Sequence, residues 1–220
     1  MKDQELSNII NQYDSSEQID GQIYTLNLGP THPATHGIFQ NVLTMDGERI
    51  LHAEQTVGYI HRAFEKISER RNFTQITTLT DRLNYCSAPI NNFGWHMTVE
   101  KLLNIKVPKR VDYLRVIFME LARIADHIIC NGVTAMDAGA ITGLTYIFQD
   151  RERIYEMYER VCGGRLTTNI GRIGGFERDI DDKFHELIQA FIKDFPARFQ
   201  EFCDLNERNR IFMDRTVNVG

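Results

Sequence analysis

The sequence contains no Cys-x-x-Cys pair, the arrangement that most often holds an iron–sulfur cluster or a structural zinc ion. Its four cysteines, Cys86, Cys130, Cys162 and Cys203, lie far apart along the chain. This spacing argues against a metal centre built by this chain alone. We expect most of these cysteines to be reduced, partly buried thiols of a cytoplasmic protein.

Long apolar runs are also absent, since no segment reaches the roughly 18 consecutive apolar residues that a membrane span needs. The segment from Met1 to Gln18 is polar and acidic, which is unlike a signal peptide. The sequence therefore predicts a soluble protein that meets a membrane only through partners. A net charge of −5 gives no indication of nucleic-acid binding, which usually requires a basic face.

The 220 residues are 42% hydrophobic and include 13 Phe and 8 Tyr, enough for a substantial core in one large or two small domains. Residues 1–20 read as a polar, weakly ordered segment, and residues 21–60 as a small antiparallel β region. Apolar and polar side chains alternate from Gly21 to Leu28, as in a half-buried strand. Residues 38–45 and 49–57 resemble a hairpin closed by the turn pair Asp46-Gly47.

Residues 61–220 have the pattern of a helical bundle, so the predicted fold class is α+β and mostly α-helical. Apolar residues recur at three- and four-residue steps over 111–129, the strongest helical pattern in the chain. Further helices are expected over 93–103, 144–161 and 181–205. Gly163-Gly164 should end the second of these, and Pro196 should kink or split the last. Residues 215–220 read as the start of a strand or turn, which indicates a fragment of a longer protein.

The loop Gly29-Pro-Thr-His-Pro-Ala-Thr-His-Gly37 carries two histidines four residues apart. On a helix, His32 and His36 could bind a metal. Because Pro30 and Pro33 bracket His32, a helix is disfavoured, and this leaves two interpretations. The loop is either a turn with surface histidines or a rigid segment that presents an imidazole, whose proton exchanges near neutral pH, to a ligand.

Three other segments contain candidate functional residues. If helical, the segment around Arg82 and Tyr85 presents a guanidinium and a hydroxyl on one face, suited to a carbonyl oxygen that gains negative charge. The alternative is a surface Arg and a core Tyr. Asp137 follows the long apolar helix and is expected to be partly buried or to cap the next helix. Residues 171–176 lack Gly-x-Gly-x-x-Gly spacing, so no NADH site is expected there.

Taken together, these segments resemble the D-type (49 kDa) subunit of the proton-pumping NADH:quinone oxidoreductase, complex I. The matching motifs occur in the order and at about the spacing of the family, and only roughly the first half of a typical member is present. They are Gly29–Gly37, Gly58-Tyr-Ile-His-Arg62, Glu65-Lys66, Arg82-Leu-Asn-Tyr85, Val99-Glu-Lys-Leu-Leu-Asn104, Asp137-Ala-Gly-Ala140, Arg151-Glu152 and Arg172-Ile-Gly-Gly175.

The resemblance implies a fold like the large subunit of nickel–iron hydrogenases, with a quinone headgroup pocket in place of the bimetallic centre. It implies that His36 and Tyr85 hydrogen-bond the quinone carbonyls and that Asp137 accompanies His36. Arg82 would lie near the tetranuclear (4Fe–4S) cluster of the B-type subunit. His32, Thr167 and Arg172 complete the implied cofactor-binding set, and the chain is expected to hold no metal of its own.

The implied assembly contains B-, C- and I-type subunits and a membrane subunit that forms the quinone channel. The implied location is the cytoplasmic face of a bacterial plasma membrane. The quinone could be ubiquinone or menaquinone. Two other functions stay open: a scaffold that does not touch substrate, and a membrane-bound hydrogenase relative. Cys86 without a second nearby cysteine argues against the hydrogenase.

Two positions depart from the family pattern. Asn84 stands where an aspartate is common. Thr167 stands where many members have a histidine near the cluster. Because threonine cannot take up a proton when the cluster gains an electron, we expect a lower cluster potential, suited to menaquinone, that hardly depends on pH. A redox titration of the assembled enzyme at several pH values measures this. A slope of one proton per electron would contradict it.

Overall fold

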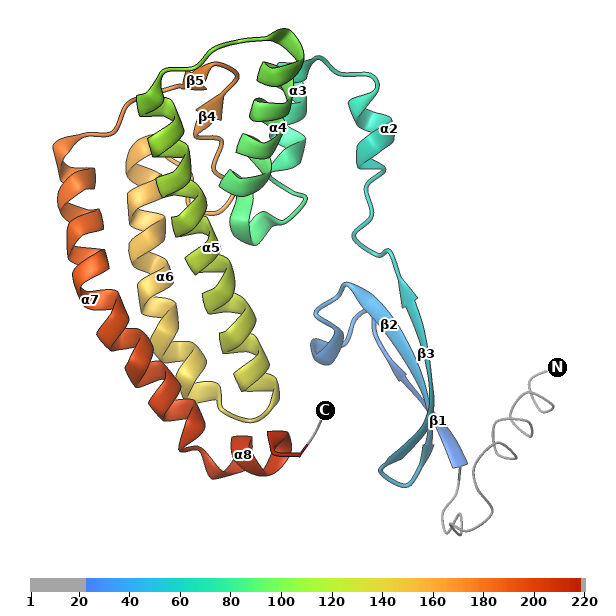
Figure 1. Ribbon diagram of the computed structural model, residues 1–220. Coiled ribbons are helices and arrows are strands. Elements are labelled where there is room, and N and C mark those ends of the chain that lie inside the picture. Colours follow the sequence, from blue (N-terminus) through green and yellow to red (C-terminus); the bar gives the residue numbers. More distant parts are fainter. Residues whose placement is uncertain (1–22, 219–220) are drawn as a thin grey trace. The chain divides into compact units, whose positions relative to one another are not determined.

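The computed structural model describes residues 23–218, and the chain divides into two compact units between Phe64 and Glu65 (Figure 1). The expectation of a weakly ordered segment over residues 1–20 lies outside the described residues. Within residues 23–218, every helix is too short or too polar to cross a membrane.

The first unit is an antiparallel sheet of three strands in the order β1-β2-β3. These strands are β1 (Ile23–Leu28), β2 (Phe39–Asp46) and β3 (Arg49–Val57). The predicted strand and hairpin are thus confirmed, with Asp46-Gly47 at the turn between β2 and β3. One face of the sheet buries Leu43, Met45 and Leu51.

The second unit is helical and confirms the predicted class of a small sheet followed by helices. Its helices are α2 (Phe64–Ser68), α3 (Phe73–Thr80), α4 (Ala88–Leu103), α5 (Lys109–Asp137), α6 (Ile141–Cys162), α7 (Asp182–Glu207) and α8 (Arg210–Thr216). A short hairpin of β4 (Gly171–Arg172) and β5 (Gly175–Phe176) connects α6 to α7. The long helices α5, α6 and α7 run alongside one another (Figure 1).

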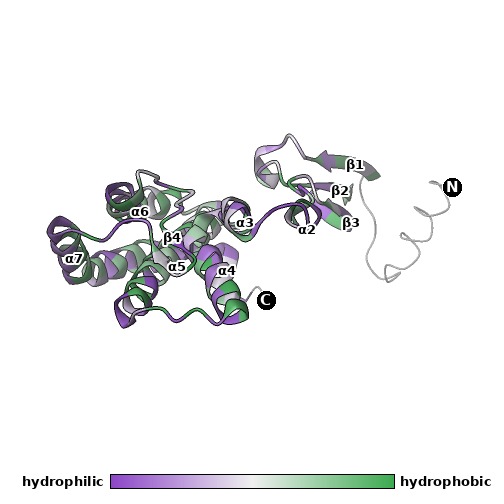
Figure 2. Cartoon of the chain, turned by 90° about the horizontal axis from the view of Figure 1, so that it is seen from above, coloured by the Kyte–Doolittle hydropathy of each residue, from purple (hydrophilic) through white to green (hydrophobic). Residues whose placement is uncertain are grey.

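The core of this unit lies where the apolar faces of α4, α5, α6 and α7 meet, and Figure 2 shows hydrophobic and hydrophilic residues on each of these helices. Phe118 is fully buried at its centre and contacts the rings of Tyr158, Phe176 and Phe184. Gly132 allows α5 and α6 to approach closely, because a Cβ there would lie 2.7 Å from Cδ1 of Leu144.

The structure corrects three sequence-based expectations. Helix α5 continues to Asp137, well beyond residue 129, because Gly132 packs against α6 instead of ending the helix. Pro196 does not split α7, which runs unbroken through it. Arg215 and Thr216, expected in a strand or turn, form the end of α8. As predicted, Gly163 ends α6 in the left-handed conformation.

Removal of the Phe118 ring should destabilise the helical unit. We expect Phe118→Ala to lower the free energy of unfolding by about 3–5 kcal/mol, because a buried aromatic ring is lost and the cavity fills only partly. Urea unfolding followed by circular dichroism measures the change. Tyr113→Ala on the same helix, where the side chain is 72% exposed, should stay within about 0.5 kcal/mol of the parent. Equal losses in the two variants would contradict this account of the core.

Candidate functional site

The loop that joins β1 to β2 is tightly folded and carries His36 at its surface. Pro33–Thr35 form one 3-10 turn. Thr35 is buried below the loop, and its hydroxyl lies 3.0 Å from the carbonyl oxygen of His32 and 3.3 Å from that of Pro30. Gly29 has a φ of +95°, and a Cβ there would lie 2.5 Å from the carbonyl oxygen of Phe39, so only glycine fits.

The two histidines of this loop differ in their surroundings. His32 caps the 3-10 turn, and its Nδ1 accepts the backbone N–H of Ala34 at 3.1 Å. His36 ends the turn in the left-handed conformation, is exposed, and has no hydrogen-bond partner for its ring among the described residues. Both line an open hollow of this unit, together with Pro30, Thr31, Pro33, Gly37 and Tyr59. The loop is therefore a tight turn with surface histidines, and a ligand at His36 stays a prediction.

Within residues 23–218, no three His, Cys, Asp or Glu side chains gather into a group that could hold a metal ion. Cys86, Cys162 and Cys203 are partly buried free thiols, as expected for most of the cysteines, whereas Cys130 is exposed.

The segment from Arg82 to Tyr85 is not a helix, so the condition for a shared helix face is not met. Arg82 lies in the turn after α3, and its Nη1 donates to the carbonyl oxygen of Thr78 at 2.5 Å. Tyr85 begins a separate 3-10 turn, Tyr85–Ser87, that leads into α4. The Tyr85 side chain is 47% exposed, and its hydroxyl has no partner among the described residues. It is therefore not a core tyrosine.

Charges of both signs lie close to this turn. Burial raises the pKa of the Cys86 thiol, the Asp126 carboxylate raises it further, and the Arg151 guanidinium lowers it. Arg151 lies over the rings of Phe148 and Tyr155, at 5.2 Å and 4.6 Å from their centroids.

The other predicted site residues of the helical unit lie on separate segments. Asp137, the last residue of α5, is exposed, and Ala140 precedes α6 as its cap. Both expectations for Asp137, partial burial and helix capping, were therefore wrong. Thr167 is exposed in the loop before β4.

Arg172 is held by its own loop. Its guanidinium donates to the side-chain and main-chain oxygens of Asn169 and pairs with Glu177. Arg172 also lines a small hollow beside α3.

A buried polar network, which sequence reasoning missed, joins three of these segments. Asn92 on α4 donates from Nδ2 to Asp81 at 2.5 Å and to the carbonyl oxygen of Thr168 at 3.1 Å, and accepts the hydroxyl of Thr80 at 2.6 Å. Burial raises the pKa of Asp81, while Asn92, Arg82 and Arg172 oppose the shift. Asn92 thereby links Asp81, which precedes Arg82, to Thr168, which follows Thr167.

A second buried group fixes the hairpin that carries Arg172. The guanidinium of Arg115 donates to both carboxylate oxygens of Glu100, at 2.5 Å and 2.7 Å, and Glu100 also accepts the backbone N–H of Gly174 at 2.7 Å. Burial by itself raises the pKa of Glu100, but the bonds from Arg115 and Gly174 outweigh it and keep this pKa below its usual value. The sequence offered no local signal for this pair, because α4 contains several other polar residues, Asn91, Asn92, His96, Thr98 and Lys101.

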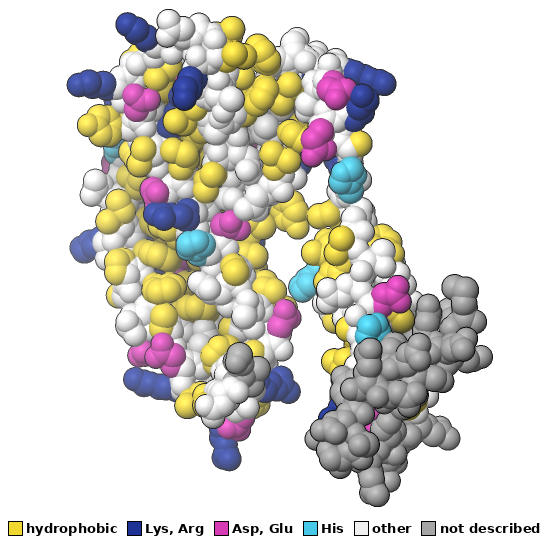
Figure 3. All heavy atoms as spheres, turned by 45° about the vertical axis from the view of Figure 1, so that its right-hand side comes forward, with side chains coloured by type: hydrophobic (Ala, Val, Ile, Leu, Met, Phe, Trp, Pro, Cys, Tyr) yellow, Lys and Arg dark blue, Asp and Glu magenta, His cyan; other side chains and the backbone are white. Residues whose placement is uncertain are grey.

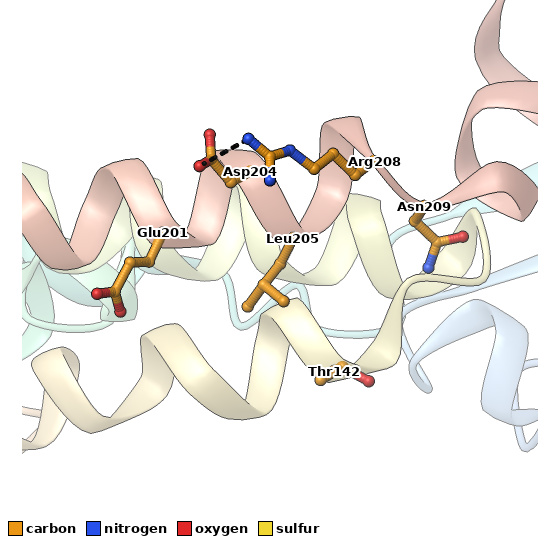
Figure 4. A pocket seen from close by; sticks show the side chains of 6 residues that line it. All are labelled: Thr142, Glu201, Asp204, Leu205, Arg208 and Asn209. Carbon is orange, nitrogen blue, oxygen red and sulfur yellow. Dashed lines mark ion pairs between the residues drawn. The ribbon is translucent and has the colours of Figure 1, made fainter.

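A further hollow lies between α6 and the end of α7, and Figure 4 shows its lining residues. They are Thr142, Glu201, Asp204, Leu205, Arg208 and Asn209. Arg208 pairs with Asp204 at 3.5 Å across one helical turn. None of the predicted site residues lines this hollow.

Comparison with known proteins gives consistent matches. The model of a family described as "Respiratory-chain NADH dehydrogenase, 49 Kd subunit" matches residues 137–220. A D-type subunit of the NADH-quinone oxidoreductase of Cytophaga hutchinsonii is 68% identical over 196 residues, which cover 89% of this chain and 50% of that protein. The corresponding protein of Flavobacterium psychrophilum is 68% identical over 199 residues, 90% of this chain and 48% of that protein. The chain belongs to this family of D-type subunits. It spans about half the length of the curated relatives it matches.

Similarity also extends to more distant bacteria. The D-type protein of Leptospira biflexa is 51% identical over 195 residues, 89% of this chain and 48% of that protein. The matches extend into the sheet unit of this D-type chain as well as the helical unit, since they include about nine tenths of its residues.

His96 makes the stability of the helical unit depend on pH. The ring is fully buried and lies 3.1 Å from the Thr77 hydroxyl. Burial lowers the pKa of His96 to about 4, Arg115 and Arg172 add to this, and Glu100 opposes it. Below pH 6.5 the unfolded chain takes up a proton that the folded chain refuses, so stability falls as pH decreases toward 4.

We expect the loss of folding stability between pH 6.5 and pH 4 to reach on the order of 3 kcal/mol. Urea unfolding of the parent and of His96→Gln at several pH values measures this loss. In the variant, the free energy of unfolding should no longer show this decrease with falling pH. His127→Gln, at an exposed position on α5, is the matched control and should keep it. Parallel pH profiles for parent and His96→Gln would contradict the account.

Proposed function

We propose that this chain contributes to the quinone headgroup pocket of NADH:quinone oxidoreductase and supplies hydrogen bonds and protons for quinone reduction. The observation that carries the proposal is Tyr85, which is half exposed and whose hydroxyl has no partner among the described residues. The residue before it, Asn84, is bonded to α4 and α5. Membership of the family of D-type subunits supports it. In the proposal, Tyr85 donates to a quinone carbonyl oxygen.

Quinone reduction consumes two electrons and two protons, and negative charge on a carbonyl oxygen is costly in a site shielded from water. A hydrogen-bond donor aimed at that oxygen stabilises the charge as it develops. The exposed imidazole of His36, which has no partner in the sheet unit, suits a second donor and a proton source. Asp137 offers an exposed carboxylate, a group that favours the protonated form of a histidine. The family resemblance implies that the Asp137 carboxylate accompanies His36.

The electron donor in this proposal is the tetranuclear iron–sulfur cluster of a B-type subunit. The residues proposed to lie toward this cluster are Arg82, Thr167 and Arg172. The buried links through Asn92 and Glu100 support this set, because they hold the three segments in fixed positions within the helical unit.

The proposed partners are the B-, C- and I-type subunits and the membrane subunit of the quinone channel, at the cytoplasmic face of the plasma membrane. The surface of the helical unit supports docking, because apolar side chains are visible among the charged ones (Figure 3). Leu102 and Tyr113, for example, are 70% and 72% exposed.

The central test is Tyr85→Phe in membranes that contain the assembled enzyme. We expect quinone reduction to fall by roughly 100-fold, the usual cost of one donor to a developing oxyanion. NADH oxidation with a hydrophilic artificial acceptor should continue at the parent rate, because electrons still enter the enzyme. Tyr113→Phe, at an exposed position on α5, should leave both rates unchanged.

Each other outcome overturns a specific part of the proposal. Full quinone reduction by Tyr85→Phe would favour a scaffold that does not touch substrate. Unchanged turnover in both His36→Ala and Asp137→Asn would overturn the roles of those two residues. Loss of both rates in Tyr85→Phe would mean that this hydroxyl serves assembly rather than substrate.

A further inference from the structure

The residue before Tyr85 has an unusually complete set of bonds for an exposed position. The amide nitrogen of the Asn84 side chain donates to the Asp126 carboxylate at 2.9 Å and to the Ser87 hydroxyl at 2.7 Å. The main-chain oxygen of Asn84 accepts the side-chain amide of Asn91 at 3.1 Å and the backbone N–H of Ser87 at 3.1 Å. Asn84 is thereby attached to α4 and α5.

Tyr85 itself lacks such attachments. Its hydroxyl has no partner among the described residues, so its position depends on the backbone that carries it. That backbone is fixed from the preceding residue, by a link to α5 across 42 positions of sequence. The 3-10 turn also packs against α5 (Figure 1).

Asp126 depends on Asn84 in return. Its carboxylate is partly buried, and the Asn84 amide is its hydrogen-bond donor among the described residues. The charged or titratable groups that face this point are Asp126 from α5, Arg151 from α6 and the Cys86 thiol of the turn. Arg151 forms no ion pair with Asp126, so a neutral donor occupies the place next to the carboxylate.

From this geometry we propose that Asn84 and Asp126 form a positioning pair that holds Tyr85 in place for its substrate. The pair requires a neutral donor at one position and a carboxylate at the other. An aspartate at position 84 would set two carboxylates within hydrogen-bonding distance, where like charges repel and the donor is lost. This inference rests on the proposed function of Tyr85.

The test uses the assembled enzyme in membranes with Asn84→Asp, Asp126→Asn and both substitutions together. We expect Asn84→Asp to lower kcat/KM for quinone by roughly 10-fold or more, while the artificial-acceptor rate is kept. The double variant restores a carboxylate–amide bond with its direction reversed, and should return to within about 3-fold of the parent. Asn131→Asp adds the same charge at an exposed position of α5 and should have no effect.

Two readouts separate positioning from a general loss of structure. Two carboxylates at one point raise the pKa of one of them, so Asn84→Asp should regain quinone reduction as pH is lowered, whereas the parent should not. In a Tyr85→Phe background, Asn84→Asp should cause no further loss, because the pair acts through the Tyr85 hydroxyl.

A third readout does not depend on turnover. The added charge should slow alkylation of Cys86 by iodoacetamide, measured on the peptide that contains it, and the double variant should reverse this. Where Asn84→Asp fails to assemble, Asn84→Ala removes the same two donors without adding charge, and it should also lower kcat/KM.

The outcomes distinguish the two proposals. If Tyr85→Phe keeps full quinone reduction, the proposed function is wrong, and the role of the pair is wrong with it. If Tyr85→Phe loses quinone reduction while Asn84→Asp and Asn84→Ala keep it, only the positioning pair is wrong. Additive losses in the combined Asn84→Asp and Tyr85→Phe variant would also overturn the pair.

Discussion

The buried ion pair between Glu100 and Arg115 connects the parts of the helical unit that local sequence cannot hold together. Their side chains are 7% and 2% exposed, so both charges have left water, at a cost of several kcal/mol per ion. Two parallel hydrogen bonds and the N–H of Gly174 offset that cost. Because Glu100 lies on α4, Arg115 on α5 and Gly174 in the hairpin, one carboxylate sets the position of three segments.

The elements that the sequence predicted well are those that nearby residues determine. The apolar stripe of α5, the glycine that ends α6 and the Asp46-Gly47 turn each act within a few residues, and all three were confirmed. Pro196 is the exception among local signals. Packing of Phe191 and Phe202 on either side of it into the core keeps α7 in one piece, so tertiary contacts outweigh the lost backbone bond.

The surroundings of the candidate site were harder to predict, because they depend on partners far away in sequence. Nothing near Asn92 indicates that it meets Thr168, 76 residues later, or that Asn84 meets Asp126. Arg82 and Tyr85 lie on different turns, and Asn84 between them is bonded to α5 and α4, which local sequence does not indicate either. The catalytic roles of His36, Tyr85 and Asp137 come from family resemblance and remain predictions.

The sheet unit described earlier buries few apolar side chains: Leu43, Met45 and Leu51 are its fully buried hydrophobic residues among those described. A three-stranded sheet with so small a core is close to the limit of independent stability. Each of these few buried side chains therefore contributes a large share of the stability of the sheet, which carries the His36 loop between β1 and β2. The position of the His36 imidazole is thus tied to the stability of this small sheet as a whole, and not only to the bonds within its own loop.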